Sequence, residues 1–198
     1  VKAIDEARRQ ADIVIVSSHG HERKGMDKTR PADFMSEFAH LCIDHGAHMF
    51  VSHGPHIWRG VEIYKGLPIF YGIGNFIFEN ESMERQPAEF YHLYNLDSTN
   101  TVSDGLDCRS LHGTRGLAAD SRVYESAAVS VTFHEGRLTR AELFPLTLHF
   151  KGSCSEKGIP ALAENTEAEQ ILRHIGALCE TYGTKMDIQQ GKGMICLL

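Results

Sequence analysis

The hydrophobic pattern of the first 51 residues alternates between helix-like and strand-like segments. Residues 2–10 mix Ala with charges at helical spacing, and residues 12–18 then form a nearly continuous β-branched run. Such a run predicts a strand that is buried on both faces, as in a parallel sheet. A second short strand is expected over 47–51. The order of strand, helix and strand indicates two parallel neighbours joined by a right-handed crossover.

A helix is expected between these two strands. Pro31 suits its first turn and Gly46 its end. Its apolar residues recur at spacings of three and four, which predicts a buried stripe made of Phe34, Phe38, Leu41 and Cys42. The polar stretch 23–30 that precedes this helix is expected to be a loop.

The second half of the chain has the period-two pattern of antiparallel strands. Hairpins are expected over 61–64 with 67–71, over 126–134 with 138–150, and over 185–188 with 194–197. A helix over 166–182 carries a stripe made of Ile171, Leu172, Ile175, Leu178 and Cys179. Residues 79–119 are polar and irregular, with short helices expected over 88–94 and 102–110. This segment is interpreted as an excursion from the sheet, serving as a lid or an oligomer contact.

Composition narrows the possible classes of protein. The 198 residues suit one domain or a large part of one, and a net charge of −6 argues against a nucleic-acid binder. No apolar stretch approaches the roughly 20 residues that cross a bilayer. The five cysteines are scattered without a C-x-x-C pair, so neither a zinc knuckle nor a disulfide framework is expected. Cys42 and Cys179 are expected to be buried packing residues.

Two histidine-bearing segments follow the two predicted parallel strands. The first is His19-Gly20-His21-Glu22, and the second is Ser52-His53-Gly54-Pro55-His56. The carboxyl ends of parallel strands meet at one sheet edge, where ligands gather in open α/β sheets. Neutral imidazoles are good ligands for zinc, manganese or iron. The pattern favours a metal site over a chance H-x-x-H on a surface loop, although few carboxylates other than Glu22 and Glu62 lie nearby.

Other chemistry has weaker support in the sequence. Ser17, Ser18 and Ser52 adjoin the histidines, but no G-x-S-x-G elbow is present. The cationic stretch that follows Glu22 is interpreted as a solvated loop in preference to an anion-binding site. Its cations are Arg23, Lys24, Lys28 and Arg30. The glycines at 72 and 74 allow a close backbone approach, which is a weak signal of function.

The ordered motifs of the chain together resemble a known family. His19-Gly20-x-Glu22, His53-Gly54-Pro55-His56, the hairpin from Gly60 to Tyr71, and Gly74-Asn75-Phe76 are similar to the CapA-type poly-γ-glutamate capsule proteins. That family belongs to the calcineurin-like metallophosphoesterase superfamily. The resemblance implies an α/β fold, specifically a four-layer α/β/β/α sandwich. Residues 1–198 would form the C-terminal portion of one such domain. The family's N-terminal Gly-Asp, Asn-x-Glu and Asn-Asn-His segments are absent, so the sandwich is expected to be incomplete at its N-terminus.

The resemblance also implies roles for individual residues. His19, His53 and His56 would be ligands of two divalent ions, Mn, Zn or Fe, and His56 or Glu22 would move a proton. Arg23, Lys24, Lys28, Arg30 and Asn75 would bind a polyanionic γ-glutamyl polymer or peptide. The missing ligands would come from an N-terminal portion or from an oligomer partner. A location at the cell envelope or its extracellular face is implied, although this segment has no predicted membrane span.

Three functions therefore stay open at this level. The first is a metal-dependent, hydrolase-like capsule enzyme that acts on a γ-glutamyl polymer or a related peptide. The second is a non-catalytic envelope scaffold for polymer assembly or export, and the third is a metal-dependent peptide epimerase. Because strands of its sheets would be missing, the isolated segment is expected to have poor stability.

Overall fold

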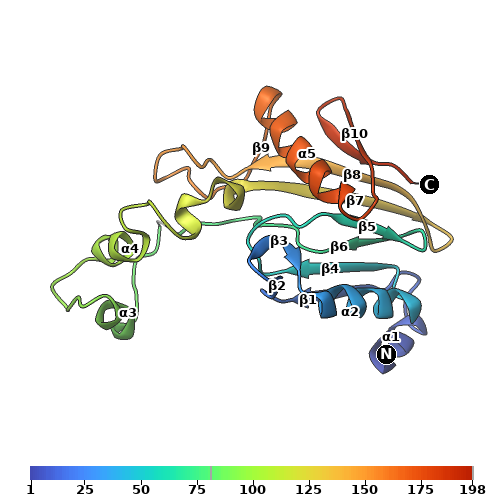
Figure 1. Ribbon diagram of the computed structural model, residues 1–198, viewed down its shortest axis with the longest axis horizontal. Coiled ribbons are helices and arrows are strands. Elements are labelled where there is room, and N and C mark those ends of the chain that lie inside the picture. Colours follow the sequence, from blue (N-terminus) through green and yellow to red (C-terminus); the bar gives the residue numbers. More distant parts are fainter. Residues whose placement is uncertain (81, 198) are drawn as a thin grey trace.

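The computed structural model describes residues 1–80 and 82–197 and contains two main β-sheets with helices packed on them (Figure 1). The first sheet has the strand order β1 (Ile15–His19), β4 (Met49–His53), β6 (Leu67–Phe70) and β5 (Val61–Tyr64). Strands β1, β4 and β6 run parallel, and β5 pairs with β6 in antiparallel fashion. The mixed α/β class, the parallel pair and the first predicted hairpin are confirmed.

The second sheet is antiparallel. Its order is β10 (Met186–Gln189), β11 (Lys192–Ile195), β8 (Arg137–Thr147) and β7 (Glu125–His134), and β9 (Ala161–Leu162) pairs with β8. Helix α5 (Asn165–Glu180) packs against this sheet, and its buried residues include Ile171, Leu172 and Ile175. The hairpins predicted over 126–150 and 185–197 and the helix predicted over 166–182 are confirmed.

Two hydrophobic clusters hold these elements together. One lies between the first sheet and the helices α1 (Lys2–Arg8) and α2 (Asp33–Asp44), and it contains the fully buried Phe50 and Ile69. The other joins the two sheets to α5 and contains Val61, Leu143 and Leu172, each with no exposed surface. The predicted burial of Cys42 and Cys179 is confirmed, and burial raises the pKa of the Cys179 thiol to about 11.

The predicted buried stripe of α2 was right at Cys42 and wrong at its other three positions. Phe34, Phe38 and Leu41 are between 43% and 53% exposed, whereas the side chains that face the sheet are Met35, Ala39, Cys42 and Ile43. Both sets have helical spacing, so periodicity alone did not separate them. The packing of α2 across β1 and β4 selects the second set.

Strand β1 also departs from the expectation of burial on both faces. Its residues alternate between exposed and intermediate, and Ile15 is 53% exposed. In the described part of the chain β1 is the end strand of the first sheet, and β7 is the end strand of the second. A β-branched run therefore forms a parallel strand here without being covered on both sides.

The stretch 23–30, expected to be a loop, contains a small hairpin instead. Strand β2 (Arg23–Lys24) pairs with β3 (Asp27–Pro31), and the turn between them contains Gly25 in the left-handed region. Pro31 ends this hairpin, and α2 begins two residues later. Five of the seven residues in these two short strands are charged, so the hydrophobic pattern carries no strand signal.

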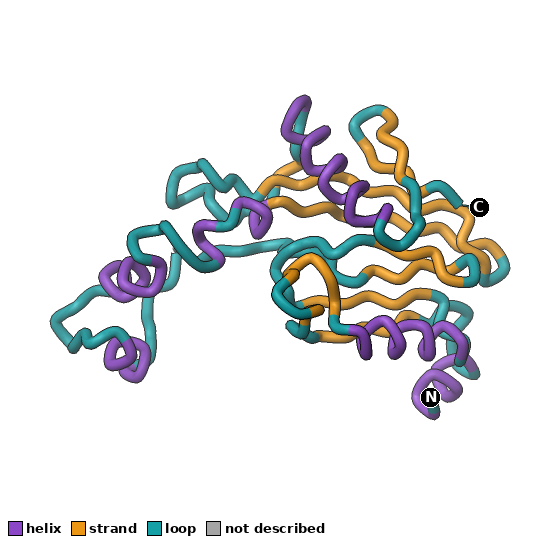
Figure 2. Tube along the Cα trace, in the orientation of Figure 1, coloured by secondary structure: helices purple, strands orange, loops and turns teal. Residues whose placement is uncertain are grey.

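The predicted excursion forms an arm beside the two sheets (Figures 1 and 2). It carries α3 (Ala88–Leu93) and α4 (Val102–Ser110), close to the predicted ranges, and then the short 3₁₀ helices η1 (Leu117–Ala119) and η2 (Ser121–Tyr124). Thr101 and Asp104 form a reciprocal cap at the start of α4. Within residues 1–80 and 82–197, no helix has both the length and the apolar character that a bilayer crossing requires.

Candidate metal centre

The two histidine-bearing segments meet at one edge of the first sheet, as the sequence predicts. Strands β1 and β4 are parallel neighbours, and His19 lies directly opposite His53 in their register. Beyond the strands, the Gly20 amide donates to the His53 carbonyl over 2.9 Å. This bond extends the pairing of the strands into the two loops.

Gly54 allows the two loops to touch. Its φ of +114° lies in the region that favours glycine. A Cβ at this position would lie 2.9 Å from the Gly20 carbonyl oxygen and 3.3 Å from the His19 Nε2. The close approach of the loops therefore depends on the absence of a side chain at residue 54.

Three imidazoles form a continuous cluster across these loops. The Nε2 atoms of His19 and His21 are 3.2 Å apart, and the ring centroids of the same residues are 5.1 Å apart. The ring centroids of His21 and His56 are 5.9 Å apart. The sequence interpretation assigned roles to His19 and His56 but none to His21. The available signal was the H-x-H spacing at a strand end.

Asn75 determines which nitrogen of His56 carries the proton. The Asn75 Nδ2 donates to the Val123 carbonyl over 2.9 Å, which leaves its Oδ1 as an acceptor toward His56. His56 Nδ1 lies 2.9 Å from that oxygen and must donate its hydrogen there. A neutral His56 then has its lone pair on Nε2, the arrangement found in histidines that bind metals. His56 itself has a φ of +64°, a left-handed backbone that is uncommon outside glycine.

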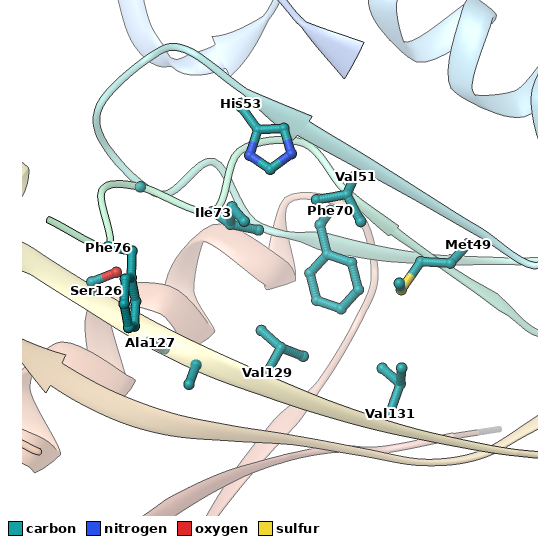
Figure 3. A pocket seen from close by; sticks show the side chains of 12 residues that line it. Met49, Val51, His53, Phe70, Ile73, Phe76, Ser126, Ala127, Val129 and Val131 are labelled. Atoms are coloured by element: carbon teal, nitrogen blue, oxygen red, sulfur yellow. The ribbon is translucent and has the colours of Figure 1, made fainter. Parts of the chain in front are cut away.

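His53 makes its side-chain hydrogen bond outside this cluster. Its Nε2 lies 3.2 Å from the Ser17 Oγ. It also borders a largely apolar cavity of about 460 Å³ between the two sheets, and Figure 3 shows Met49 and Val51 of β4 facing Val129 and Val131 of β7 across this space. The structure thus brings His19 and His56 close to His21, and it places His53 beside Ser17 of β1 and in the lining of the cavity.

The buried side chain of Arg59 donates hydrogen bonds to the backbone of the His21 loop and of the β2–β3 hairpin. Arg59 is 2% exposed, and its guanidinium donates to the Lys28 carbonyl over 3.0 Å and to the His21 carbonyl over 3.3 Å. Burial lowers the pKa of Arg59, while Tyr182 and Glu22 act in the opposite direction. Glu22 is exposed at the same loop, and its carboxylate lies against Gly20. The sequence interpretation missed Arg59, because nothing in its pattern distinguishes a buried arginine from a surface one.

The remaining candidate residues lie around this centre. Arg23, Lys24, Lys28 and Arg30 occupy the exposed β2–β3 hairpin, where Lys24 pairs with Asp33 over 2.8 Å. Asn75 has both polar atoms of its amide bonded within the protein. Glu62 contacts His40 of α2 and the hydroxyl of Tyr71, which directly follows β6, and so lies apart from the histidine loops.

The donor set suits a divalent transition metal. Imidazole nitrogens are the common ligands of zinc and iron, and the fixed tautomer of His56 leaves a nitrogen available. Within the described ranges, 1–80 and 82–197, no three or more His, Cys, Asp or Glu side chains are already gathered closely enough to hold an ion. The imidazoles of the two loops therefore fit only part of a metal centre.

Comparison with known proteins places these motifs in a family context. Residues 1–80 match the family model described as bacterial capsule synthesis protein PGA_cap. The whole chain aligns with the uncharacterized protein y4sH of Sinorhizobium fredii at 32% identity over 206 residues, which is 44% of that protein. The PGA biosynthesis protein CapA of Bacillus subtilis is 39% identical over 79 residues, covering 40% of this chain and 20% of that protein.

A further relative extends the similarity beyond the family match. The capsule biosynthesis protein CapA of Bacillus anthracis is 35% identical over 103 residues, covering 52% of this chain and 24% of that protein. The chain spans less than half the length of each of these relatives.

Proposed function

We propose that the histidine cluster is part of a divalent-metal centre acting on a γ-glutamyl polymer or a related peptide, and the match of residues 1–80 to the bacterial capsule synthesis protein family supports this proposal. The observation that carries the proposal is the chain of contacts from Val123 through Asn75 to His56. A surface histidine needs no such fixed tautomer. A histidine that presents one nitrogen to a ligand does need it.

The residues of this centre would have distinct tasks. His19, His53 and His56 would hold the ions, and Asn75 would orient His56. When bound, the ions would polarise the scissile carbonyl and increase the acidity of a water molecule. Glu22 is exposed on the same loop as His21. It would therefore exchange a proton with the reacting groups and with solvent.

The charge of the β2–β3 hairpin supports the proposed substrate class. A γ-glutamyl chain is a polyanion, and an acidic protein needs a local cationic surface to bind it. The exposed β2–β3 hairpin supplies Arg23, Lys28 and Arg30 directly beside the His21 loop. In this proposal the hairpin holds the polymer while the histidine edge acts on one bond.

We also propose that the longer protein completes a four-layer α/β/β/α sandwich around this segment. Strands β1 and β7 end their sheets in the described part of the chain, and an apolar cavity lies between the sheets beside His53. Additional strands beside β1 and β7 would cover this cavity and bring further ligands to the centre. A non-catalytic scaffold with the same fold is the second candidate, and it shares the cationic hairpin but needs no ions.

Removal of metal is expected to distinguish these two candidates. The full-length protein should shorten poly-γ-glutamate when loaded with Zn²⁺ or Mn²⁺, should stop after treatment with a chelator, and should recover when the ion is restored. Polymer length is measured by gel electrophoresis or light scattering. If the polymer binds but keeps its length under every metal condition, the catalytic proposal is wrong and the scaffold is favoured.

Charge removal on the hairpin is expected to weaken polymer binding. Replacing Arg23, Lys28 and Arg30 with Gln should raise the apparent KM for the polymer about tenfold or more at low salt, with a smaller change in kcat. The effect should shrink as the salt concentration rises. The matched control replaces Arg109, Arg137 and Lys151, which lie outside the hairpin. Equal KM values for the two triple variants would contradict a binding role for the hairpin.

A further inference from the structure

The spacing of His19 and His21 has a specific chemical meaning. Zinc binds imidazole nitrogen at about 2.0–2.1 Å in tetrahedral geometry, so two such nitrogens on one ion are about 3.3–3.4 Å apart. The Nε2 atoms of His19 and His21 are separated by 3.2 Å. Two imidazoles already converge at the distance that one tetrahedral ion requires.

From this geometry we infer that His21 is an additional metal ligand, which forms a two-imidazole chelate with His19 on a single ion. The inference rests on the proposed metal centre and adds a ligand to it. In the metal-free chain the same separation suits an N–H···N hydrogen bond between the two rings. For both rings to bind one ion through Nε2, the ring that donates this hydrogen would instead carry it on Nδ1, with solvent relaying the proton. The two Nε2 atoms already face each other, so the pair is arranged for the ion beforehand.

The backbone around His21 holds the pair in place. The Arg59 guanidinium binds the His21 carbonyl from the buried side, and the Gly20 amide binds the His53 carbonyl. Residue 20 also has little space, because a Cβ there would lie 2.9 Å from the Met35 Cε. These contacts restrict the middle and last residues of the short H-x-H segment. His21 therefore has a defined backbone from which to reach the His19 ring.

An extra imidazole changes which metal the centre prefers. Imidazole ligands suit zinc and iron, whereas manganese favours oxygen ligands from carboxylates, carbonyls and water. With His21 included, three imidazoles lie in one cluster through the contacts of His21 with His19 and His56. The centre is accordingly expected to select Zn²⁺ over Mn²⁺, and His21 is the residue on which this selectivity depends.

The test measures metal binding separately from turnover. Affinities for Zn²⁺ and for Mn²⁺ are determined by competition with a chromophoric chelator for the full-length parent, His19→Ala, His21→Ala and the control His134→Ala, which alters an exposed histidine at the end of β7. His21→Ala should lower Zn²⁺ affinity at least about tenfold while changing Mn²⁺ affinity much less. His134→Ala should match the parent for both ions.

Two results would overturn the inference, and they have different consequences for the proposed function. If His21→Ala keeps the parent's Zn²⁺ affinity while His19→Ala loses it, His21 is not a ligand and the metal centre still stands. If the parent binds neither ion, both the inference and the proposed centre fail. Should His21→Ala fold poorly, carbethoxylation of the parent replaces it. Protection of His21 by Zn²⁺, measured by mass spectrometry, supports the inference, and equal labelling with and without Zn²⁺ contradicts it.

Discussion

A Gly54→Ala variant is expected to lose about 2–5 kcal/mol of unfolding free energy and to separate the two histidine loops. Two costs add at this residue. The backbone has a φ of +114°, which a side chain strains, and the new Cβ would lie 2.9 Å from the Gly20 carbonyl oxygen. Because that contact is with backbone, no side-chain rotation relieves it. The loop must move, and the Gly20 to His53 hydrogen bond is lost with it.

Gly66→Ala provides the matched control for this variant. Gly66 has a φ of +79° in the turn between β5 and β6, and a Cβ there would meet nothing within 4 Å. It therefore carries the backbone strain alone, which costs about 1–2 kcal/mol. The difference between the two variants in urea unfolding isolates the loop contact. In addition, Gly54→Ala should lower Zn²⁺ affinity whereas Gly66→Ala should not. Equal stabilities and equal affinities would show that the approach of the two loops is unimportant.

The sequence predicted the parts of this centre that depend on chain order. Parallel strands joined by a short helix must end at the same sheet edge, so the meeting of the His19 and His53 segments followed from topology. The hairpins and α5 were also predictable, because their hydrophobic patterns allow one assignment. These features need only local periodicity and the rules of connection.

The sequence did not predict features that depend on which of two similar helix faces packs against the sheet, or on partners that are distant in the chain. In α2, two stripes have the same helical spacing, and contact with the sheet selects Met35 and Ala39 over Phe34 and Phe38. At the site, His21 and Arg59 owe their roles to partners that are distant in sequence. Arg59 reaches the His21 carbonyl across 38 residues, and Asn75 reaches Val123 across 48. No spacing rule connects such pairs.

Loss of His56 is expected to reduce the proposed metal-dependent turnover of the polymer by about a hundredfold or more, because it removes the imidazole whose tautomer the protein fixes. His56→Asn is the preferred substitution. His56 has a left-handed backbone with a φ of +64°, and Asn tolerates that conformation better than Ala. Turnover and bound metal should fall together, while thermal stability should change little.

Asn75 separates the role of the imidazole from the role of its orientation. Asn75→Leu removes the acceptor that fixes the His56 proton on Nδ1 but leaves the imidazole itself in the chain. It should lower the metal affinity by about 10- to 100-fold, which is the usual effect of losing the hydrogen-bond partner of a metal-binding histidine. Asn75→Asp keeps the acceptor oxygen, so it should retain more affinity than Asn75→Leu.

If His56→Asn leaves bound metal and turnover at parent levels, His56 is not a ligand. The loss of metal affinity should be largest for His56→Asn, smaller for Asn75→Leu and smallest for Asn75→Asp. A metal centre with an oriented ligand requires this order, whereas a surface histidine would give no such order.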